Sequence, residues 1–301
     1  DEAFQFIYRF VSSRPFVNGS IEANEDLLDE GVLSVAKFHE EGEIRWLPLI
    51  HGNGPLTSEF GFDSQADVMI ETRRAAQMLG ATRLDRPEGI SVDPITGHVF
   101  VMLTQGLSRG TESVDKANPR YENLFGHILE LVPPQLGGKA AHAAELMEWE
   151  VLLLAGDPDN PEHGARYNPL AGKDEWFGNP DNCTFDPWGR LWVATDLAPV
   201  TLGVADGLYV VPVRGAGRAR PKRFVALPAG AELCGPCFTP DGTSLFFSVQ
   251  HPGEGSRFED PSTRWPDYDP EMPPRPGVVV VTRKNGGAIG RSALETQTDD
   301  T

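Results

Sequence analysis

Residues 85–101 read DRPEGISVDPITGHVFV. The second half of this stretch predicts a β-hairpin, because a short apolar strand, an Asp-Pro-x-x-Gly turn and a strand of β-branched and aromatic residues follow one another. The pattern returns at residues 180–196 (PDNCTFDPWGRLWVATD) and 235–249 (GPCFTPDGTSLFFSV). Aligning the turns places Asp93 opposite Asp186 and Thr239, and places Glu88 opposite Asp181. An acid at the entry of two equivalent strands is the main functional signal of the sequence.

Further strand-like segments extend each hairpin into a set of four strands. The predicted sets are 89–93, 98–104, 126–131 and 146–154; then 182–186, 190–195, 207–213 and 222–227; then 236–239, 244–250 and 277–283. A weak last strand is expected after residue 283. Repeated four-stranded units around a constant hairpin are typical of a β-propeller.

The first part of the chain predicts a further, incomplete unit. Segments 4–12, 32–38 and 43–50 give three strands, and we expect the innermost strand to come from upstream sequence. Residues 64–79 form the one convincing helix, with Ser64 as its cap and Gly80 at its end. Segments 107–123 and 251–276 are long loop insertions, rich in Pro, Gly and charge.

The expected fold is therefore all-β. It is a propeller of four-stranded blades, with about three to four blades present, one helix and long loop insertions. Residues 1–301 are expected to be a single propeller domain, the C-terminal part of a larger, six-bladed propeller. The chain opens on Asp1-Glu2-Ala3-Phe4 without an initiator Met or a signal peptide, which favours a piece of something longer.

Composition limits the partners. A net charge of −18 argues against nucleic acid and against anionic membranes, while clustered acids suit hard cations such as calcium. No apolar run approaches the roughly 20 residues that span a bilayer. The oligomeric state leaves no signal in the sequence.

The loops that enter the inner strands of a propeller line one mouth of its central channel. Glu88 and Asp181 are expected to converge there, with Glu232 approaching from the next blade. Carboxylates from separate blades suit a metal ion, although they could instead accept hydrogen bonds from backbone amides of neighbouring turns. Arg86, beside Glu88, could hold a phosphate or carboxylate, or could form a salt bridge with Asp85 or an acid of the rim.

Several longer motifs resemble those of the PhoX-type alkaline phosphatases, over about residues 4–287. The matching segments are 73–76 with 80–82, 85–88, 118–123 with 126–128, 180–182, 230–233, 235–242 and 250–254. The resemblance implies a propeller of secreted bacterial phosphomonoesterases, exported through the twin-arginine route, whose site combines iron and calcium ions. It therefore implies a small phosphate-ester substrate and a periplasmic or secreted protein.

The resemblance also implies roles for single residues. Glu88 would be a metal ligand at the iron–calcium cluster, Arg86 would hold the substrate phosphate, and Asp181 and Glu232 would bind calcium. The implied mechanism is phosphoryl transfer to water, in which Arg86 steadies the developing charge. The family's cysteine iron ligand and further acids lie upstream of this chain. Gly89 replaces a Trp that many members carry, and Gln105-Gly106 replaces a pair of Asn residues.

Two other functions remain open on the residues alone. One is a calcium-dependent propeller hydrolase of the lactonase type, because the Asp181-Asn182 hairpin also resembles those enzymes. The other is a non-catalytic propeller that binds a partner or a polysaccharide. The tetrapeptide Cys234-Gly235-Pro236-Cys237 matches a thioredoxin redox motif, but it runs into a strand and turn instead of a helix start, which disfavours redox chemistry.

Overall fold

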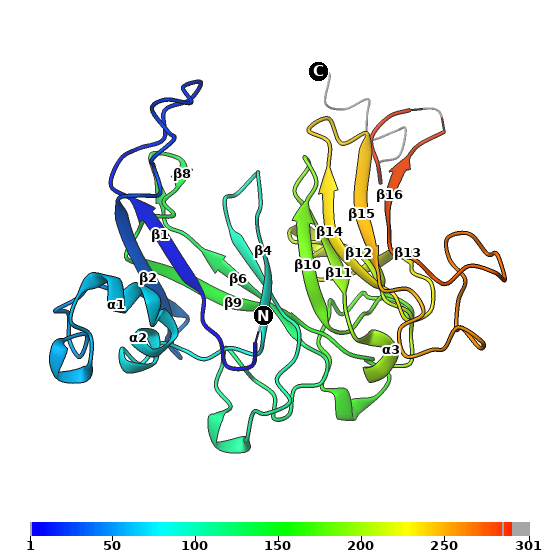
Figure 1. Ribbon diagram of the computed structural model, residues 1–301, viewed down its shortest axis with the longest axis horizontal. Coiled ribbons are helices and arrows are strands. Elements are labelled where there is room, and N and C mark those ends of the chain that lie inside the picture. Colours follow the sequence, from blue (N-terminus) through cyan, green and yellow to red (C-terminus); the bar gives the residue numbers. More distant parts are fainter. Residues whose placement is uncertain (1, 285, 291–301) are drawn as a thin grey trace. The chain divides into compact units, whose positions relative to one another are not determined.

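The structure is a computed structural model that describes residues 2–284 and 286–290 (Figure 1). Within these residues the chain forms two compact units. Unit 1 contains segments 2–87, 106–122 and 131–150, and unit 2 contains segments 88–105, 123–130, 151–284 and 286–290. The chain passes between the two units at several points, so each unit is built from pieces that are distant in the sequence.

Unit 1 is built on antiparallel strands in the order β1–β2–β3–β9. Their bounds are Tyr8–Ser12 (β1), Gly31–Phe38 (β2), Glu43–Pro48 (β3) and Leu146–Leu154 (β9). The predicted hairpin of residues 32–50 is confirmed, with Val35 opposite Leu47. The first residues of β9 pair with β3, with Ile44 opposite Met147, whereas β1 is at the other end of the order. The innermost strand expected from upstream sequence stays a prediction. A short hairpin, β7 (Gln135–Leu136) and β8 (Lys139–Ala140), belongs to the same unit.

The predicted helix of residues 64–79 is present but is broken into α1 (Gln65–Ile70) and α2 (Thr72–Met78). Ser64 caps α1, because its Oγ accepts a hydrogen bond from the amide of Asp67 at 3.3 Å. Helical geometry fails at Glu71, where φ is −98° and ψ is 37°. The Thr72 hydroxyl turns back to the carbonyl of Met69, a local bond that competes with the helix. Both helices pack beside β2 around a core that includes Val35, Val68, Ala75 and Ala76 (Figure 1).

Unit 2 contains the three predicted hairpins and the strands that extend them. Its sheets run β4–β5–β6 with the end of β9, then β10–β11–β12–β13, then β14–β15–β16. The bounds are Pro87–Val92 (β4), Val99–Leu103 (β5), His127–Val132 (β6), Pro180–Phe185 (β10), Arg190–Thr195 (β11), Gly207–Pro212 (β12), Lys222–Ala226 (β13), Glu232–Phe238 (β14), Ser244–Gln250 (β15) and Gly277–Thr282 (β16). Short helical segments are α3 (Ala198–Thr201), η1 (Ser58–Phe60), η2 (Thr111–Ser113), η3 (Pro161–His163) and η4 (Gly215–Gly217), of which η1 and η2 belong to unit 1.

The three hairpin turns begin in the same way, as the sequence alignment predicted, although the second is one residue shorter. The amides of Asp93, Asp186 and Thr239 donate to the carbonyls of His98, Arg190 and Ser244 at 2.9, 3.1 and 3.0 Å. In each turn the side chain at the same position also accepts a backbone amide: that of Ile95 for Asp93, those of Trp188 and Arg190 for Asp186, and that of Ser244 for Thr239. These local bonds explain why an Asp or Thr recurs where each turn begins.

Burial in unit 2 follows the strand patterns. Strand β15 alternates, with Leu245, Phe247 and Val249 buried, whereas β11 is buried on both faces around Trp192. Two clusters result, one around Phe100, Phe177 and Tyr209 and one around Trp192 and Leu245. The repeated hairpins contribute residues to both clusters, and the remaining core residues come from the strands and loops that extend them.

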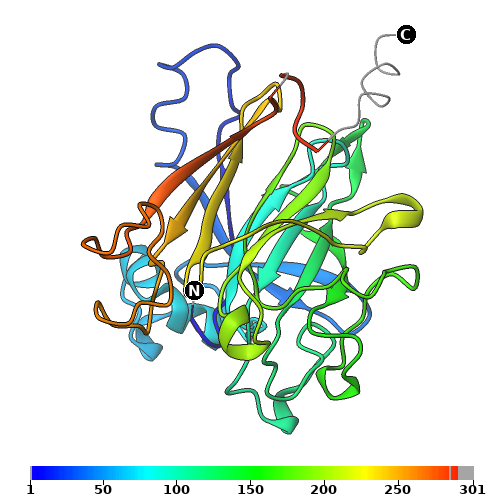
Figure 2. The same cartoon turned by 90° about the vertical axis from the view of Figure 1, so that its right-hand side faces the viewer.

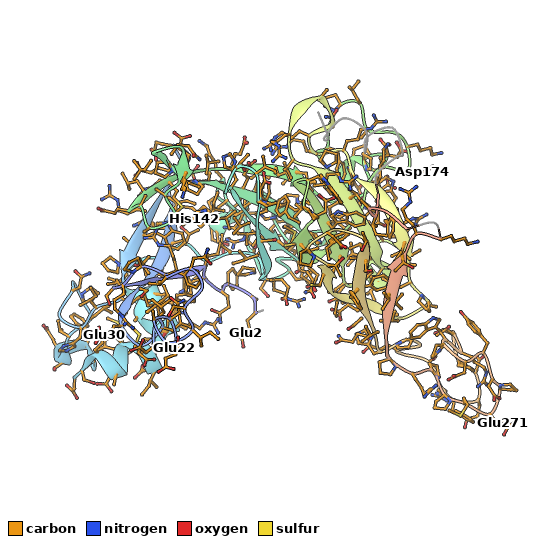
Figure 3. All side chains as sticks on the ribbon, turned by 90° about the horizontal axis from the view of Figure 1, so that it is seen from above. Glu2, Glu22, Glu30, His142, Asp174 and Glu271 are labelled. Atoms are coloured by element: carbon orange, nitrogen blue, oxygen red, sulfur yellow. The ribbon has the colours of Figure 1, made fainter. Side chains whose placement is uncertain are left out.

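The structure is all-β with few helices, as predicted. Both long insertions are loops, and the segment between β15 and β16 extends beyond the ends of those strands (Figure 2). Glu271 lies exposed at the tip of this segment, as Glu22 and Glu30 lie on the surface of unit 1 (Figure 3). The weak last strand expected after residue 283 is absent from 283–284 and 286–290, and residues 291–301 lie outside the described part. The single domain and the six-bladed propeller stay predictions.

No helix in the described part of the chain combines the length and the apolarity needed to cross a bilayer.

Replacing Asp186 with Ala is expected to destabilise unit 2 strongly. Its carboxylate is 0 % exposed and accepts hydrogen bonds from Arg190 Nε at 2.6 Å and from Trp192 Nε1 at 2.9 Å. Leaving these buried donors without an acceptor should lower the free energy of unfolding by about 3 kcal/mol. Urea denaturation followed by Trp fluorescence measures the loss. Asp241→Ala, in the exposed third turn, is the control, and an equal shift for both variants would contradict the assignment.

Candidate functional site

The three predicted acids begin three strands of unit 2. Glu88 and Asp181 are the second residues of β4 and β10, and Glu232 is the first residue of β14. Each acid follows, two residues later, a residue in the left-handed region: Arg86 (φ 45°), Asn179 (φ 52°) and Gly230 (φ 70°). For the two non-glycine residues this conformation is costly and needs support from the surroundings.

Asp181 is the most buried of the three acids, with 3 % of its surface exposed. Its Oδ1 accepts a hydrogen bond from Thr104 Oγ1 at 3.3 Å and its Oδ2 accepts one from Asn182 Nδ2 at 2.7 Å. Burial, followed by the charges of Glu88, Glu232 and Asp196, raises the pKa of Asp181 to about 8. The charges of the other two predicted acids thus act on the carboxyl group of Asp181.

Glu232 is held by three neighbours. Its Oε1 accepts a hydrogen bond from Cys234 Sγ at 2.9 Å, and its Oε2 accepts one from Gln250 Nε2 at 2.6 Å and lies 3.1 Å from His251 Nε2. Burial alone would lower the pKa of His251, but the Gly230 carbonyl and the carboxylates of Glu232 and Glu254 raise it overall. His251 thus contacts the carboxylate of Glu232, a contact that the sequence did not predict.

Strand register separates Glu232 from the other two acids. Strands β10 and β14 each carry a one-residue bulge, so positions in the two strands can be matched by counting back from their turns. By this count Leu233, which pairs with Val249, corresponds to Pro180, which pairs with Thr195. Cys234 therefore occupies the repeat position of Asp181, and Glu232 lies two residues earlier in its strand. Glu232 therefore resembles the other two acids only in lying at the beginning of a strand, since it does not occupy their position in the repeat.

Asp206 and Asp196 belong to the same acidic region and were missed from the sequence. Asp206 is 3 % exposed and accepts hydrogen bonds from Thr195 Oγ1 at 2.7 Å and from the Ala198 amide at 3.2 Å. Burial, with the charges of Asp196 and Glu232, raises the pKa of Asp206 to about 7 despite these bonds. Asp196 ends the second hairpin copy, which was the available signal, whereas Asp206 lies in a loop without a motif.

Asn179 fixes the backbone that enters β10. It is 0 % exposed, its Nδ2 donates to the carbonyls of Thr104 (3.1 Å) and Leu124 (2.8 Å), and its Oδ1 accepts from Thr201 Oγ1 at 2.6 Å. Asn tolerates the left-handed region better than most residues do. This buried, fully bonded Asn therefore sets the direction in which Pro180 and Asp181 leave the loop.

Gly89 allows β4 to lie directly against β10. A Cβ built at residue 89 would lie 2.5 Å from the Asp181 carbonyl oxygen and 3.0 Å from the Cys183 amide nitrogen. The glycine that departs from the family pattern is thus required by the packing of this chain.

The turn ends of β4, β10 and β14 also meet, around a cavity of about 350 Å³ whose lining includes Ser91, Thr184 and Thr239.

Arg86 lies at the end of a segment of unit 1, whereas the acids belong to unit 2. Pro87 alone separates it from Glu88 in the chain. Asp85 is bound to Arg109, whose Nε lies 2.6 Å from Asp85 Oδ1. The alternative salt bridge of Arg86 with Asp85 or an acid of the rim stays a prediction. The role of Arg86 as a phosphate clamp stays a prediction, as do the metal-binding roles of Glu88, Asp181 and Glu232.

The acidic region fits a cation by its charge and donor chemistry. Burying Asp181 among Glu88, Glu232 and Asp196 creates repulsion that a positive ion would relieve, and carboxylate oxygens are the ligands that calcium prefers. Within residues 2–284 and 286–290, however, no three His, Cys, Asp or Glu side chains are arranged to hold an ion. These residues therefore fit part of a metal site and do not form a complete one.

The Cys-Gly-Pro-Cys tetrapeptide lies inside β14, away from any helix start, as expected. Cys234 and Cys237 are free. Burial and the hydrogen bond to Glu232 raise the pKa of the Cys234 thiol, which is the opposite of what a redox nucleophile needs. The geometry thus argues against disulfide-exchange chemistry at this motif.

Taken together, the fold and site define an all-β protein with acidic side chains at the entries of three strands, of which Asp181 is buried. A family model, "Alkaline phosphatase PhoX", matches residues 1–253, and the chain belongs to that family. The structure of Pseudomonas fluorescens PhoX in complex with vanadate, a transition state analogue, matches with a TM-score of 0.85 and 33 % identity, over 96 % of this chain and 51 % of that one. The chain thus spans about half the length of that relative.

Two other solved structures are much more distant. A luciferin-regenerating enzyme matches at 11 % identity with a TM-score of 0.37, over 87 % of this chain and 56 % of that one. XC5397, a gluconolactonase from Xanthomonas campestris, matches at 16 % identity with a TM-score of 0.29, over 56 % and 36 %. Neither likeness bears on fold or function. No curated protein sequence matches the chain.

Replacing Gly89 with Ala is expected to force β4 away from β10, because the new Cβ would meet the Asp181 carbonyl oxygen at 2.5 Å. We expect a loss of about 1–3 kcal/mol in stability from overpacking. Calorimetric melting measures this loss. Gly217→Ala is the matched control, since its Cβ would meet only Pro212, at 3.7 Å. Unchanged melting in the Gly89 variant would contradict the packing argument.

The metal-free protein is expected to lose stability as the pH rises. The folded-state pKa values of Asp181 (about 8) and Asp206 (about 7) lie above the roughly 4 of an unfolded chain, so the folded state binds protons more tightly. The stability that these two protonated carboxyl groups contribute is then fully present below pH ~4 and is lost as the pH rises through ~7–8.

Melting temperatures of chelator-treated protein, measured from about pH 5.5 to 9, test this dependence. Asp206→Asn should flatten the fall, because it removes one of the groups that titrate in that range. Asp241→Asn is the control, since hydrogen bonds from Thr239 and Thr243 lower the pKa of Asp241 and place its titration outside the range. An unchanged slope in the Asp206 variant would refute the assignment.

Proposed function

We propose that the chain is part of a metal-dependent phosphomonoesterase that hydrolyses small phosphate esters. Family membership over residues 1–253 and the 33 % identity with a PhoX structure that binds vanadate carry the proposal. Vanadate mimics a phosphoryl group in transfer, so the relative's ligand indicates the reaction class. The acidic region around Asp181 is what this chain would contribute to the metal centre.

Within this proposal, Glu88, Asp181 and Glu232 are metal ligands and Arg86 binds the phosphate of the substrate. The ions, when bound, supply charge neutralisation and an oxygen nucleophile. We propose iron and calcium for them, following the resemblance of the motifs. Oε1 of Glu232 accepts one hydrogen bond, from Cys234, so its second lone pair is available to a metal ion, whereas Oε2 contacts both Gln250 and His251. Arg86 would donate to phosphate oxygens and stabilise the charge that develops on them.

A periplasmic or secreted location, reached through twin-arginine export, is part of the same proposal. It fits the secreted phosphatases whose motifs the chain resembles.

The test combines elemental analysis of the intact protein with hydrolysis of a chromogenic phosphate ester. We expect iron with calcium, and a fall of at least about 100-fold in kcat/KM for both Arg86→Ala and Glu88→Ala. Glu30→Ala, an exposed acid of unit 1, is the control and should keep full activity.

Other outcomes separate the alternatives. Calcium alone without phosphatase activity would favour a lactonase-type hydrolase. Binding of a partner that survives Glu88→Ala, with no metal present, would favour a non-catalytic propeller.

A further inference from the structure

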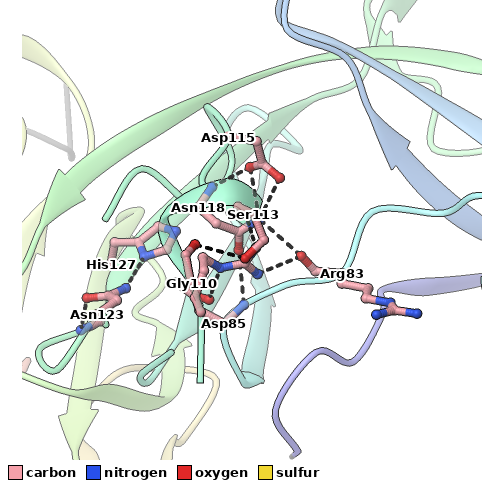
Figure 4. A network of polar contacts seen from close by, with 10 residues as sticks. Arg83, Asp85, Gly110, Ser113, Asp115, Asn118, Asn123 and His127 are labelled. Atoms are coloured by element: carbon pink, nitrogen blue, oxygen red, sulfur yellow. Dashed lines mark hydrogen bonds and ion pairs between the residues drawn. The ribbon is translucent and has the colours of Figure 1, made fainter. Parts of the chain in front are cut away.

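The segment that leads to Arg86 is held by the loop of residues 107–123, at a buried arginine (Figure 4). Arg109 is 2 % exposed, and its Nε donates to Asp85 Oδ1 at 2.6 Å. Its Nη2 donates to the Arg83 carbonyl at 2.9 Å and its Nη1 to the Ser113 carbonyl at 2.6 Å. One planar guanidinium thus ties two residues just before Arg86 to the loop.

Asn118 binds the same segment from a second point. It is 0 % exposed, its Oδ1 accepts the Asp85 amide at 3.1 Å, and its Nδ2 donates to the Arg83 carbonyl at 3.0 Å. Asp115 in turn fixes Asn118, because Asp115 Oδ1 accepts both the Asn118 amide (2.7 Å) and Asn118 Nδ2 (2.9 Å). Figure 4 shows these residues gathered around Asp85 and Arg83.

Gly106 provides the space for this arrangement. A Cβ at residue 106 would lie 2.2 Å from Asp85 Oδ1, the atom that binds Arg109. The larger residue expected from the family pattern could not occupy this place while the ion pair is formed. The departure at Gly106 and the buried pair therefore belong together.

The backbone of Arg86 needs such support. Its φ of 45° lies in the left-handed region, which is unfavourable for a residue with a long side chain. Leu84 is bound on both sides, since its amide donates to Gln5 at 2.9 Å and its carbonyl accepts from Arg86 at 3.1 Å. The residues before Arg86 are thus fixed one after another, as a strained backbone at a functional position requires.

We propose that Arg109 and Asn118 are positioning residues that hold Arg86 in its phosphate-binding conformation. The inference rests on the proposed function, in which Arg86 contacts the substrate. A buried ion pair contributes little net stability compared with apolar packing, so stability alone does not account for an arginine at this place. Groups that orient a binding side chain typically change affinity or activity by about 10–100-fold when they are removed.

The experiment measures vanadate affinity, calcium affinity, kcat, KM and melting temperature on the intact protein. Arg109→Met should weaken vanadate binding by about 10–100-fold and raise KM, with calcium affinity unchanged. Arg109→Lys keeps the charge but not the planar fork, and should recover only part of the loss. Arg190→Met is the matched control, because Arg190 pairs with buried Asp186 through Nε at the same 2.6 Å; it should lower the melting temperature without changing vanadate affinity.

Asn118→Ala decides the case if Arg109→Met does not fold. It should also weaken vanadate binding, while leaving the Arg109–Asp85 pair in place. Wild-type vanadate affinity in both Arg109→Met and Asn118→Ala, or in Asn118→Ala alone where the other does not fold, would overturn the proposal and leave the phosphatase assignment intact. A wild-type protein that neither binds vanadate nor hydrolyses phosphate esters would instead overturn the proposed function, and this inference with it.

Discussion

Repulsion among the carboxylates around Asp181 is the constraint to which the rest of unit 2 is adapted. Burying one charge beside Glu88, Glu232 and Asp196 opposes folding, because the carboxylate loses solvation and meets like charges. The hydrogen bonds of Thr104 and Asn182 offset only part of this cost. A chain selected for stability alone would not keep such a cluster in its interior. The cost is understandable if a cation binds there, since binding to the folded state stabilises it by mass action.

Left-handed backbone turns direct the acids to this place. Asn179 pays for its conformation with three side-chain hydrogen bonds inside unit 2, and Arg86 depends on the Asp85, Arg109 and Asn118 network inside unit 1. Both residues precede a proline and then an acid, so the same local sequence pattern is stabilised by two unrelated sets of neighbours. The two residues share a backbone conformation but not the neighbours that stabilise it. This is expected if function requires the direction in which the chain leaves each residue, and packing does not.

Most of the fold could be predicted because hairpin turns and alternating strands are local signals. The Asp-Pro-x-x-Gly turn carries its own hydrogen bonds, and the predicted bounds of β9, β11 and β15 agree with the structure. What failed depended on distant contacts or on competing local bonds. The break at Glu71 follows from the Thr72 hydroxyl, and the pairing of β9 with β3 joins residues about a hundred positions apart. Glu88, Asp181 and Glu232 could be selected as candidates from the sequence because they lie at the beginning of predicted strands. Asp206 could not, because what distinguishes it is its burial, which raises its pKa and leaves no signal in the sequence.

The loop of residues 107–123 shows most clearly where sequence reasoning stops. Its Pro, Gly and charged residues are typical of a solvated insertion, yet Arg109 and Asn118 are among the most buried polar residues of unit 1. A charged residue in a loop is usually exposed. The role of Arg109 therefore becomes visible only from its contact with Asp85 in the structure. The two glycine departures have the same origin: Gly89 and Gly106 each make room for a neighbouring polar group, the Asp181 carbonyl in one case and the Asp85 carboxylate in the other. In the sequence, the glycines at 89 and 106 depart from the family pattern and weaken the functional assignment. In the structure, they make room for the groups that surround Asp181 and precede Arg86, the residues on which the proposed function depends.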